Sequence, residues 1–271
     1  MEKIKITVDD AKRIQNEILI YFNDFCNKHG LKMYLYAGTL LGAVRHKGFI
    51  PWDDDIDVCM SRSDYNKLLS LIDELDDDYV IASRELNKKY LYPFGKIYKK
   101  NTSCVEFHNP KFCGIDLGIY VDIFPIDYVG DTIEEANANC NFMLERIYES
   151  MNYLHHIPRG NILTKNLRRI KNFIKNNPIK RKKNFKIIDE FMHKYEKPTK
   201  YSAVVAWVNS SKTILETSQY AGGVELTFEG RTYLSYDGHI EFLEKLFGDY
   251  MTLPPVEQRE VHGFDSYIYK K

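Results

Sequence analysis

The chain has 271 residues, with 38 Lys and Arg against 38 Asp and Glu, so its formal net charge is zero. This length gives one substantial core or two small lobes, and the balanced charge points to no nucleic-acid partner. Because no apolar run approaches the roughly 18 to 20 residues of a membrane span, the N-terminus lacks a signal-peptide stretch and the five cysteines form no CxxC pair, we expect a cytoplasmic protein with reduced thiols.

The N-terminal part alternates helix and strand signals. Apolar residues recur at helical spacing over 9–29, with Asp9 or Asp10 as the cap and Gly30 as the stop. The further predictions, in chain order, are a strand at 32–37, a glycine turn at Gly38-Thr39 into a short helix, a strand at 55–60, a helix capped by Ser61 or Ser63, strands at 79–82, 94–98, 103–107 and 120–124, a helix over 132–154, β-like segments at 203–208 and 224–228, and a helix at 237–247.

These elements predict an α/β (α+β) fold in which a mixed sheet is flanked by helices. We place a boundary near residue 130, between a catalytic core at 1–130 and a mainly helical lobe with short strands at 131–271. The segment 159–200 is rich in Lys and Arg and has few acids. It is either the solvated face of two helices or a contact with anionic lipid headgroups or an anionic acceptor.

The acidic run from Pro51 to Val58 is the strongest chemical signal. On a strand, alternate side chains share a face, so Asp55 and Asp57 point the same way while Ile56 and Val58 enter the core. Two carboxylates about 7 Å apart along a strand suit Mg²⁺ or Mn²⁺, with substrate phosphates completing the shell. An EF-hand is disfavoured because Val58 stands where that loop requires glycine.

Two further features belong to the same predicted site. Gly38 and Thr39 precede a short helix, whose N-terminus can bind a phosphate, and Arg45 follows as a source of positive charge. A simple turn and cap remains the alternative. Asp122 lies between apolar neighbours in Val121-Asp122-Ile123, so a neighbouring strand would bring a third carboxylate, as a metal ligand or as a general base.

Together these residues resemble the LicD family. The matching segments are Tyr36-Ala37-Gly38-Thr39-Leu40-Leu41-Gly42-Ala43-Val44-Arg45-His46, Gly48-Phe49-Ile50-Pro51-Trp52-Asp53-Asp54-Asp55-Ile56-Asp57, Asp64-Tyr65, Val121-Asp122-Ile123-Phe124-Pro125-Ile126-Asp127, Gly248-Asp249-Tyr250-Met251 and Leu253-Pro254-Pro255. The resemblance implies a nucleotidyltransferase-like fold. It also implies transfer of phosphocholine from CDP-choline to a hydroxyl of a bacterial cell-surface glycan (teichoic acid, lipopolysaccharide or capsule), with release of CMP.

The resemblance also implies roles for individual residues. The metal, Mg²⁺ or Mn²⁺, is assigned to Asp55, Asp57 and Asp122, with Asp53 beside them or on a second ion. Donor phosphates are assigned to Gly38, Thr39, Arg45 and Lys96. Choline would need aromatic faces, for which the candidates are Tyr34, Tyr36, Trp52, Tyr92, Tyr120 and Trp207.

Three alternatives stay open. The transferred group can be another phospho-alcohol, since related eukaryotic proteins transfer ribitol phosphate from CDP-ribitol and glycerol phosphate is chemically similar. A DxD nucleotide-sugar glycosyltransferase would also use paired carboxylates and a metal. A non-catalytic scaffold would retain the fold alone. The expected partners are a CDP-alcohol, a glycan acceptor that can be lipid-linked, and the inner face of a membrane through 159–200, with no nucleic acid.

Overall fold

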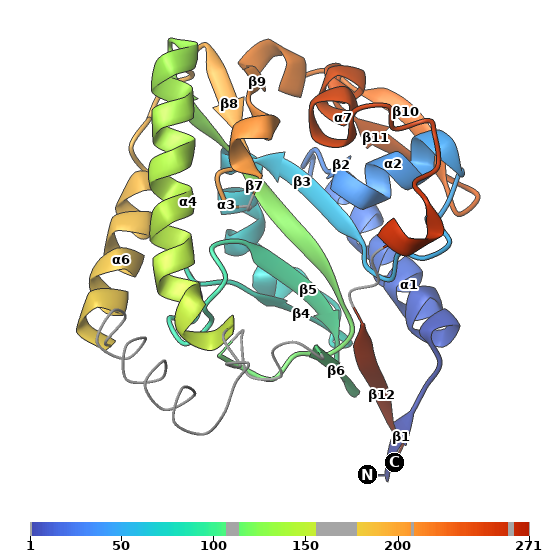
Figure 1. Ribbon diagram of the computed structural model, residues 1–271. Coiled ribbons are helices and arrows are strands. Elements are labelled where there is room, and N and C mark those ends of the chain that lie inside the picture. Colours follow the sequence, from blue (N-terminus) through green and yellow to red (C-terminus); the bar gives the residue numbers. More distant parts are fainter. Residues whose placement is uncertain (1, 107–113, 156–177, 207–208, 260–262, 271) are drawn as a thin grey trace.

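The computed structural model describes residues 2–106, 114–155, 178–206, 209–259 and 263–270 (Figure 1). Its largest sheet has seven strands in the order β2-β3-β7-β5-β4, with β8 paired to β7 and β9 paired to β8. The bounds are Tyr34–Leu35 for β2, Asp57–Ser61 for β3, Tyr79–Ala82 for β4, Gly95–Lys99 for β5, Tyr120–Gly130 for β7, Tyr201–Ala203 for β8 and Leu215–Glu216 for β9.

The central strands of this sheet are β3 and β7, which run parallel, while β5 lies antiparallel on the other side of β7. Nearly all residues of β7 are buried, as expected for a strand covered on both faces. In register, Asp122 of β7 has Asp57 of β3 on one side and Lys96 of β5 on the other. One acidic–acidic–basic row therefore crosses the middle of the sheet.

Two small sheets complete the strands. One contains β1 (Glu2–Lys5), β12 (Phe264–Lys270) and β6 (Thr102–Glu106) in the order β1-β12-β6, and the other is the hairpin of β10 (Val224–Phe228) and β11 (Arg231–Ser235). Figure 1 shows β1 and β12 side by side in an arm below the body of the molecule, with the two ends of the chain together.

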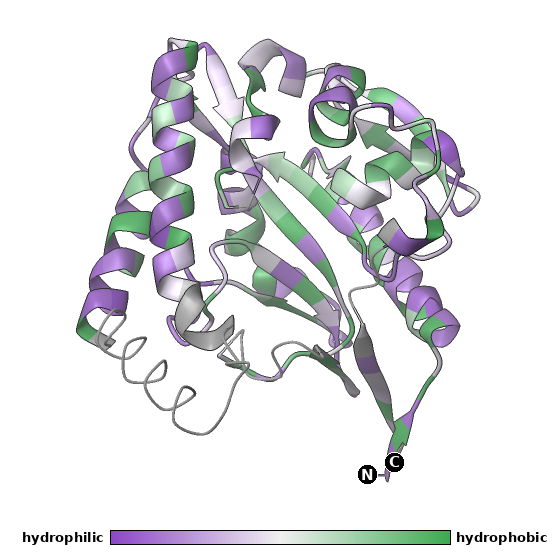
Figure 2. Cartoon of the chain, in the orientation of Figure 1, coloured by the Kyte–Doolittle hydropathy of each residue, from purple (hydrophilic) through white to green (hydrophobic). Residues whose placement is uncertain are grey.

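The helices surround the large sheet. They are α1 (Val8–Lys28), α2 (Ala37–Arg45), α3 (Arg62–Ser70), α4 (Ile133–His155), α6 (Pro178–Phe191) and α7 (His239–Phe247), with 3-10 turns η1 (Ile72–Glu74), η2 (Ser210–Thr213), η3 (Thr217–Tyr220) and η4 (Val256–Gln258). In Figure 2 the apolar colour runs along β3 and β7, whereas α1, α4 and α6 alternate between apolar and polar residues. This alternation is that of helices with one buried face. Within the described residues, no helix is both long and apolar enough to span a membrane.

Two apolar cores lie in this framework. The larger joins α1, α2 and the strands of the main sheet to Tyr233, Tyr236 and Phe242 from the hairpin and α7. The smaller lies between α4, α6 and the end of β7, around Met143 and Ile188. The α/β mixed fold is confirmed. The larger core takes residues from both sides of position 130, and the lobe boundary there stays a prediction.

The structure differs from the sequence-based prediction at three element boundaries. The cap of α1 is Thr7 instead of Asp9 or Asp10, because the Thr7 hydroxyl accepts the N–H of Asp10 in a capping box. The acidic strand begins at Asp57, so Asp55 lies in the preceding loop. Helix α2 begins at Ala37, which places the predicted glycine turn within its first helical turn.

Candidate active site

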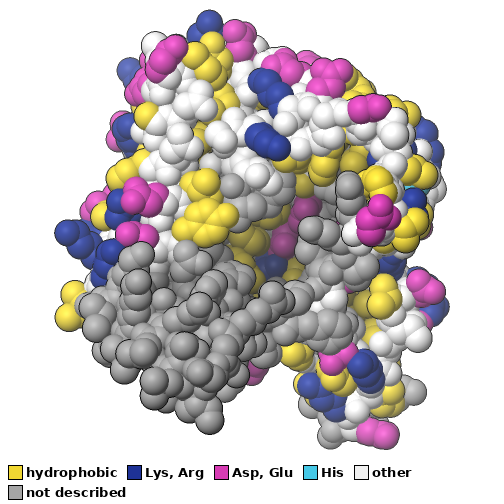
Figure 3. All heavy atoms as spheres, in the orientation of Figure 1, with side chains coloured by type: hydrophobic (Ala, Val, Ile, Leu, Met, Phe, Trp, Pro, Cys, Tyr) yellow, Lys and Arg dark blue, Asp and Glu magenta, His cyan; other side chains and the backbone are white. Residues whose placement is uncertain are grey.

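A cavity of about 940 Å³ opens beside the charged row. Its walls include the predicted carboxylates Asp53, Asp55, Asp57 and Asp122. Gly38 and Arg45 of α2 line it as well. Figure 3 shows the hollow near the middle of the face, with acidic side chains inside it. The structure therefore brings residues from α2, the loop before β3, β3 itself and β7 to one concave surface, as the sequence predicted.

Lys96 and Asp122 form a buried ion pair behind this surface. The Lys96 ammonium lies 2.5 Å from Asp122 Oδ1, and the two residues are 2% and 8% exposed. Because an unpaired buried charge is costly, each group stabilises the other in this position. Lys96 does not line the cavity, so its charge reaches a ligand only through Asp122.

The position of Asp57 is set by the end of β2 and the start of α2. Its backbone N–H donates to the Thr39 hydroxyl at 2.8 Å, and its carbonyl accepts the N–H of Tyr36 at 3.0 Å. Thr39 is 3% exposed and does not line the cavity, so its hydroxyl serves this internal contact. The Asp57 side chain is held at the cavity by two backbone anchors.

The carboxylate of Asp53 lies against Gly38 in the first turn of α2. A Cβ placed on Gly38 would come within 2.5 Å of Asp53 Oδ2, which is closer than real Cβ contacts. The N-cap residue Tyr36 makes no side-chain capping bond, so the positive end of α2 faces this carboxylate. Glycine at 38 is thus required for an anion to approach the helix terminus.

The opposite wall is formed by the segment that follows α7. Arg45 Nη1 donates to the Tyr250 carbonyl at 2.6 Å. The guanidinium groups of Arg45 and Arg259 lie 5.9 Å and 4.4 Å from the Trp52 ring centroid. Burial lowers the pKa of Arg45 from its usual value. The tryptophan before the acidic loop is therefore flanked by two cations.

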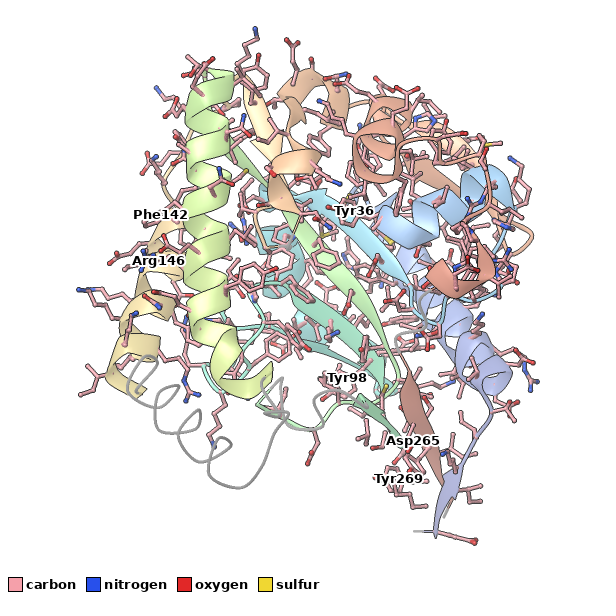
Figure 4. All side chains as sticks on the ribbon, viewed as in Figure 1. Tyr36, Tyr98, Phe142, Arg146, Asp265 and Tyr269 are labelled. Atoms are coloured by element: carbon pink, nitrogen blue, oxygen red, sulfur yellow. The ribbon has the colours of Figure 1, made fainter. Side chains whose placement is uncertain are left out.

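The aromatic residues predicted as candidates for contact with choline lie in different parts of the structure. Trp52 and Tyr92 line the cavity, whereas Tyr34 lines another one. Tyr36 is fully buried with its ring 5.4 Å from Phe124 and 5.1 Å from Phe242, and Figure 4 places it inside the fold near β3. Tyr120 lies beneath the Lys96 ammonium, 3.5 Å from its ring centroid. Trp207 falls outside the described residues.

Asp127, the second carboxylate of β7, lies toward the far end of the strand. It lines a second cavity, of about 570 Å³, and accepts Arg62 Nε at 2.6 Å and Nη2 at 3.0 Å. Burial raises the pKa of Asp127 while the Arg62 guanidinium opposes that shift. Asp116 is exposed and lines neither cavity. Asp122 is the β7 carboxylate of the candidate site.

The donor set fits a hard divalent cation. It consists of carboxylate oxygens, and Asp57 and Asp122 are register neighbours on adjacent strands. Among the side chains that the structure describes, no group of three His, Cys, Asp or Glu residues converges on one metal position. A magnesium ion commonly takes only one or two protein carboxylates, together with water and substrate phosphates. Two of the four carboxylates therefore suffice.

Sequence reasoning missed the part that Arg259 plays, because stacking on Trp52 joins positions far apart in the chain. It also missed the aromatic residues Phe94, just before β5, and Phe124, on β7, which line the cavity beside the charged row. Alternation was the available signal, since Phe94 lies two positions before Lys96 and Phe124 two positions after Asp122, on the face that carries the ion pair.

Comparison with known proteins agrees with this geometry. The family model described as LicD/FKTN/FKRP, nucleotidyltransferase domain, matches residues 30–159, which contain all four carboxylates. Lipopolysaccharide cholinephosphotransferase LicD of Haemophilus influenzae is 29% identical, over 97% of this chain and 99% of its own. This chain also has short matches to uncharacterized proteins of Rickettsia prowazekii (37% identical) and Rickettsia typhi (45% identical), each covering at most 20% of either chain. Motif, cavity and near full-length similarity coincide, and residues 30–159 of the chain form a domain of the LicD family.

Proposed function

We propose that the protein transfers phosphocholine from CDP-choline to a hydroxyl of a bacterial cell-surface glycan and releases CMP. The supporting observation is the adjacency of Asp57 and Asp122 on the floor of a cavity that also receives the N-terminus of α2. The near full-length similarity to a protein named as a lipopolysaccharide cholinephosphotransferase supports the same assignment.

The donor pyrophosphate is placed between α2 and the carboxylates. Gly38 leaves room for a phosphate oxygen at the helix N-terminus, where Asp53 lies in the ligand-free protein. Donor binding would therefore displace the Asp53 carboxylate from Gly38. Arg45, anchored to the Tyr250 carbonyl, would contribute positive charge from the same wall.

A bound Mg²⁺ or Mn²⁺ would neutralise charge on the pyrophosphate and on the leaving CMP. Asp57, with Asp55 or Asp122, would hold it, and Asp53 is available to a second ion. Asp122 lines the cavity and accepts the Lys96 ammonium through Oδ1. We assign its carboxylate either to the metal or to the proton of the attacking hydroxyl.

In the reaction, the acceptor oxygen forms a bond to the phosphorus that carries choline. The bond from this phosphorus to the bridging oxygen breaks, and CMP leaves with both electrons. The acceptor proton passes to a carboxylate or to solvent. Positioning and charge stabilisation supply the rate enhancement, as expected for transfer of a phosphoryl-type group.

The proposal extends to the acceptor and to the location of the enzyme. The cavity is open enough for a glycan hydroxyl, and we propose a lipid-linked acceptor at the inner membrane face as the natural substrate. Of the basic segment 159–200, residues 159–177 fall outside the described part, and in α6 the side chains of Lys182 and Lys183 are exposed. Contact with anionic headgroups through this segment stays a prediction.

The test is CMP release from a panel of CDP-choline, CDP-ribitol and CDP-glycerol with glycan acceptors, followed by product analysis. We expect CDP-choline to be consumed with Mg²⁺ or Mn²⁺ and to yield a phosphodiester that carries choline. Asp57→Asn should lower turnover by several orders of magnitude, whereas Asp116→Asn, on an exposed residue, should not. A new glycosidic bond from a nucleotide sugar, or full activity of Asp57→Asn, would refute the assignment.

A further inference from the structure

The active-site cavity has two ends of different chemistry. At one end, Arg45 and Arg259 flank Trp52, and the helix terminus of α2 lies nearby. At the other end the wall is aromatic and includes Tyr92, Phe94 and Phe124. The charged row of Asp57 and Asp122 lies on the sheet between them. A donor that spans the cavity must therefore place one kind of chemical group at the cationic end and another at the aromatic end.

The cationic end suits anionic groups. Two guanidinium groups lie within 6 Å of the Trp52 ring, so the faces of the only described tryptophan are already taken by positive charge. A further cation would meet repulsion there, whereas the phosphates of a nucleotide would be attracted. Of the aromatic residues that line the cavity, Trp52 is therefore the least suited to bind choline.

The aromatic end is a continuous wall of rings. The ring centroids of Tyr92 and Phe94 are 4.9 Å apart, and those of Phe94 and Phe124 are 4.4 Å apart. Each residue is less than 10% exposed. The half-exposed ring of Tyr148, from α4, lines the same cavity. Ring faces attract cations, and more strongly where water is excluded.

The aromatic wall lies close to the charged row along the strands. Phe124 follows Asp122 by two positions on β7, so its side chain lies on the same face and about 7 Å further along. The P–O–C–C–N chain of phosphocholine spans a gap of this order. The Lys96 ammonium, 4.9 Å from the Tyr92 centroid and 5.5 Å from that of Phe94, has its charge matched by Asp122.

We propose that Tyr92, Phe94 and Phe124, with Tyr148 at the opening, form the subsite for the trimethylammonium group of the transferred alcohol. This rests on the proposed function and assigns the residues that set its specificity. The wall favours a methylated ammonium alcohol over a polyol, because its ring faces attract a cation while only the hydroxyls of Tyr92 and Tyr148 could bond to the several hydroxyl groups of a polyol.

A neutral isostere separates charge recognition from shape. Replacing the choline nitrogen by carbon gives CDP-3,3-dimethylbutanol, which has the same shape without the charge. For the wild-type protein we expect kcat/KM to be roughly 5- to 30-fold higher with CDP-choline than with this isostere. In Phe94→Leu and Tyr148→Leu that ratio should fall toward one, and the loss should appear mainly in KM for CDP-choline.

The control is Phe142→Leu, on the same helix as Tyr148. Phe142 packs beside Phe191 and under the Arg146 guanidinium, and Figure 4 places both Phe142 and Arg146 on the side of α4 away from the cavity. This variant should keep the wild-type ratio. Tyr148→Leu changes a half-exposed side chain, so it remains informative if Phe94→Leu does not fold.

The outcomes are distinct. Wild-type protein that consumes CDP-choline with equal kcat/KM for the isostere, or variants that keep the wild-type ratio, overturn the aromatic subsite and leave the transfer reaction in place. Wild-type protein that consumes none of the CDP-alcohols overturns the proposed function. A preference for charge that falls in both cavity variants and persists in Phe142→Leu supports the subsite.

Discussion

The Asp53 carboxylate lies against Gly38, so that a methyl group at position 38 would come within 2.5 Å of Asp53 Oδ2. This contact places a side-chain anion at the end of α2, where a donor phosphate is proposed to bind. The acidic loop thus supplies an anion at the site where the donor phosphate would have to bind.

Gly38→Ala should weaken donor binding. The added methyl group fills the approach to the helix N-terminus, and we expect the Kd for CDP-choline to rise at least about tenfold, measured by calorimetry. The free energy of unfolding shows whether the clash with Asp53 is the cause. Asp53→Ala in the Gly38→Ala background should recover stability, because the clash needs both groups. Strictly additive effects of the two changes would show that the contact is not the reason.

Thr39→Val should destabilise the protein although it keeps the size of the side chain. The partly buried N–H of Asp57 would lose the Thr39 hydroxyl as its acceptor, which costs up to about 1–3 kcal/mol. Urea unfolding measures the change, and Thr39→Ser, which retains the hydroxyl, is the matched control. A Thr39→Val protein as stable as Thr39→Ser would mean that the hydroxyl does not anchor β3.

Lys96→Met should be among the most damaging single changes in the sheet. It removes the Lys96 ammonium from the Asp122 carboxylate, and breaking a buried pair costs about 3–5 kcal/mol. Lys186→Met breaks an exposed pair with Glu190 and should cost at most about 0.5 kcal/mol. In the Asp122→Asn background, Lys96→Met should cost less. If the cost is the same in both backgrounds, the two groups are not coupled.

Acid should loosen the packing of α4 against α6. Glu149 accepts bonds from Lys180 and Asn184, and its pKa is lowered from 4.5, with the Lys180 bond as the largest cause. A lowered pKa means that this contribution is present above pH 4.5 and is lost as the pH falls through the folded-state value. The pair is partly exposed, so its value is at most about 1 kcal/mol.

The measurement compares wild type with Glu149→Gln by urea unfolding at pH 7 and at pH 3. The stability difference between the two proteins should shrink at the lower pH, as protonation of Glu149 removes the charge that Gln lacks at every pH. A difference that is equal at the two pH values would show that the charge of Glu149 contributes nothing to this packing.

Local patterns predicted much of the fold. The apolar–Asp–apolar pattern was enough to place Asp57 and Asp122 on neighbouring strands, because each must bury its flanking residues while keeping a carboxylate accessible. Strands β4 and β10 have the predicted bounds, since each is short and flanked by turn residues.

What could not be predicted depends on register and distance. The register of β5 with β7 decides whether Lys96 faces a ligand or Asp122, and this register cannot be read from the sequence. Likewise, Arg45 meets the carbonyl of Tyr250 across 205 positions, and no local pattern encodes such a contact. The sequence identified the candidate residues, while the structure separates those that face the cavity from those that support them.

Trp52 gives the protein an intrinsic optical signal. It is one of only two tryptophans in the chain, and its indole lies at the cavity wall between two guanidinium groups. Replacing the other, Trp207, by phenylalanine would leave a single emitter whose spectrum responds to the electric field of an arriving nucleotide. Occupancy of the cavity could then be followed in real time, without a labelled substrate.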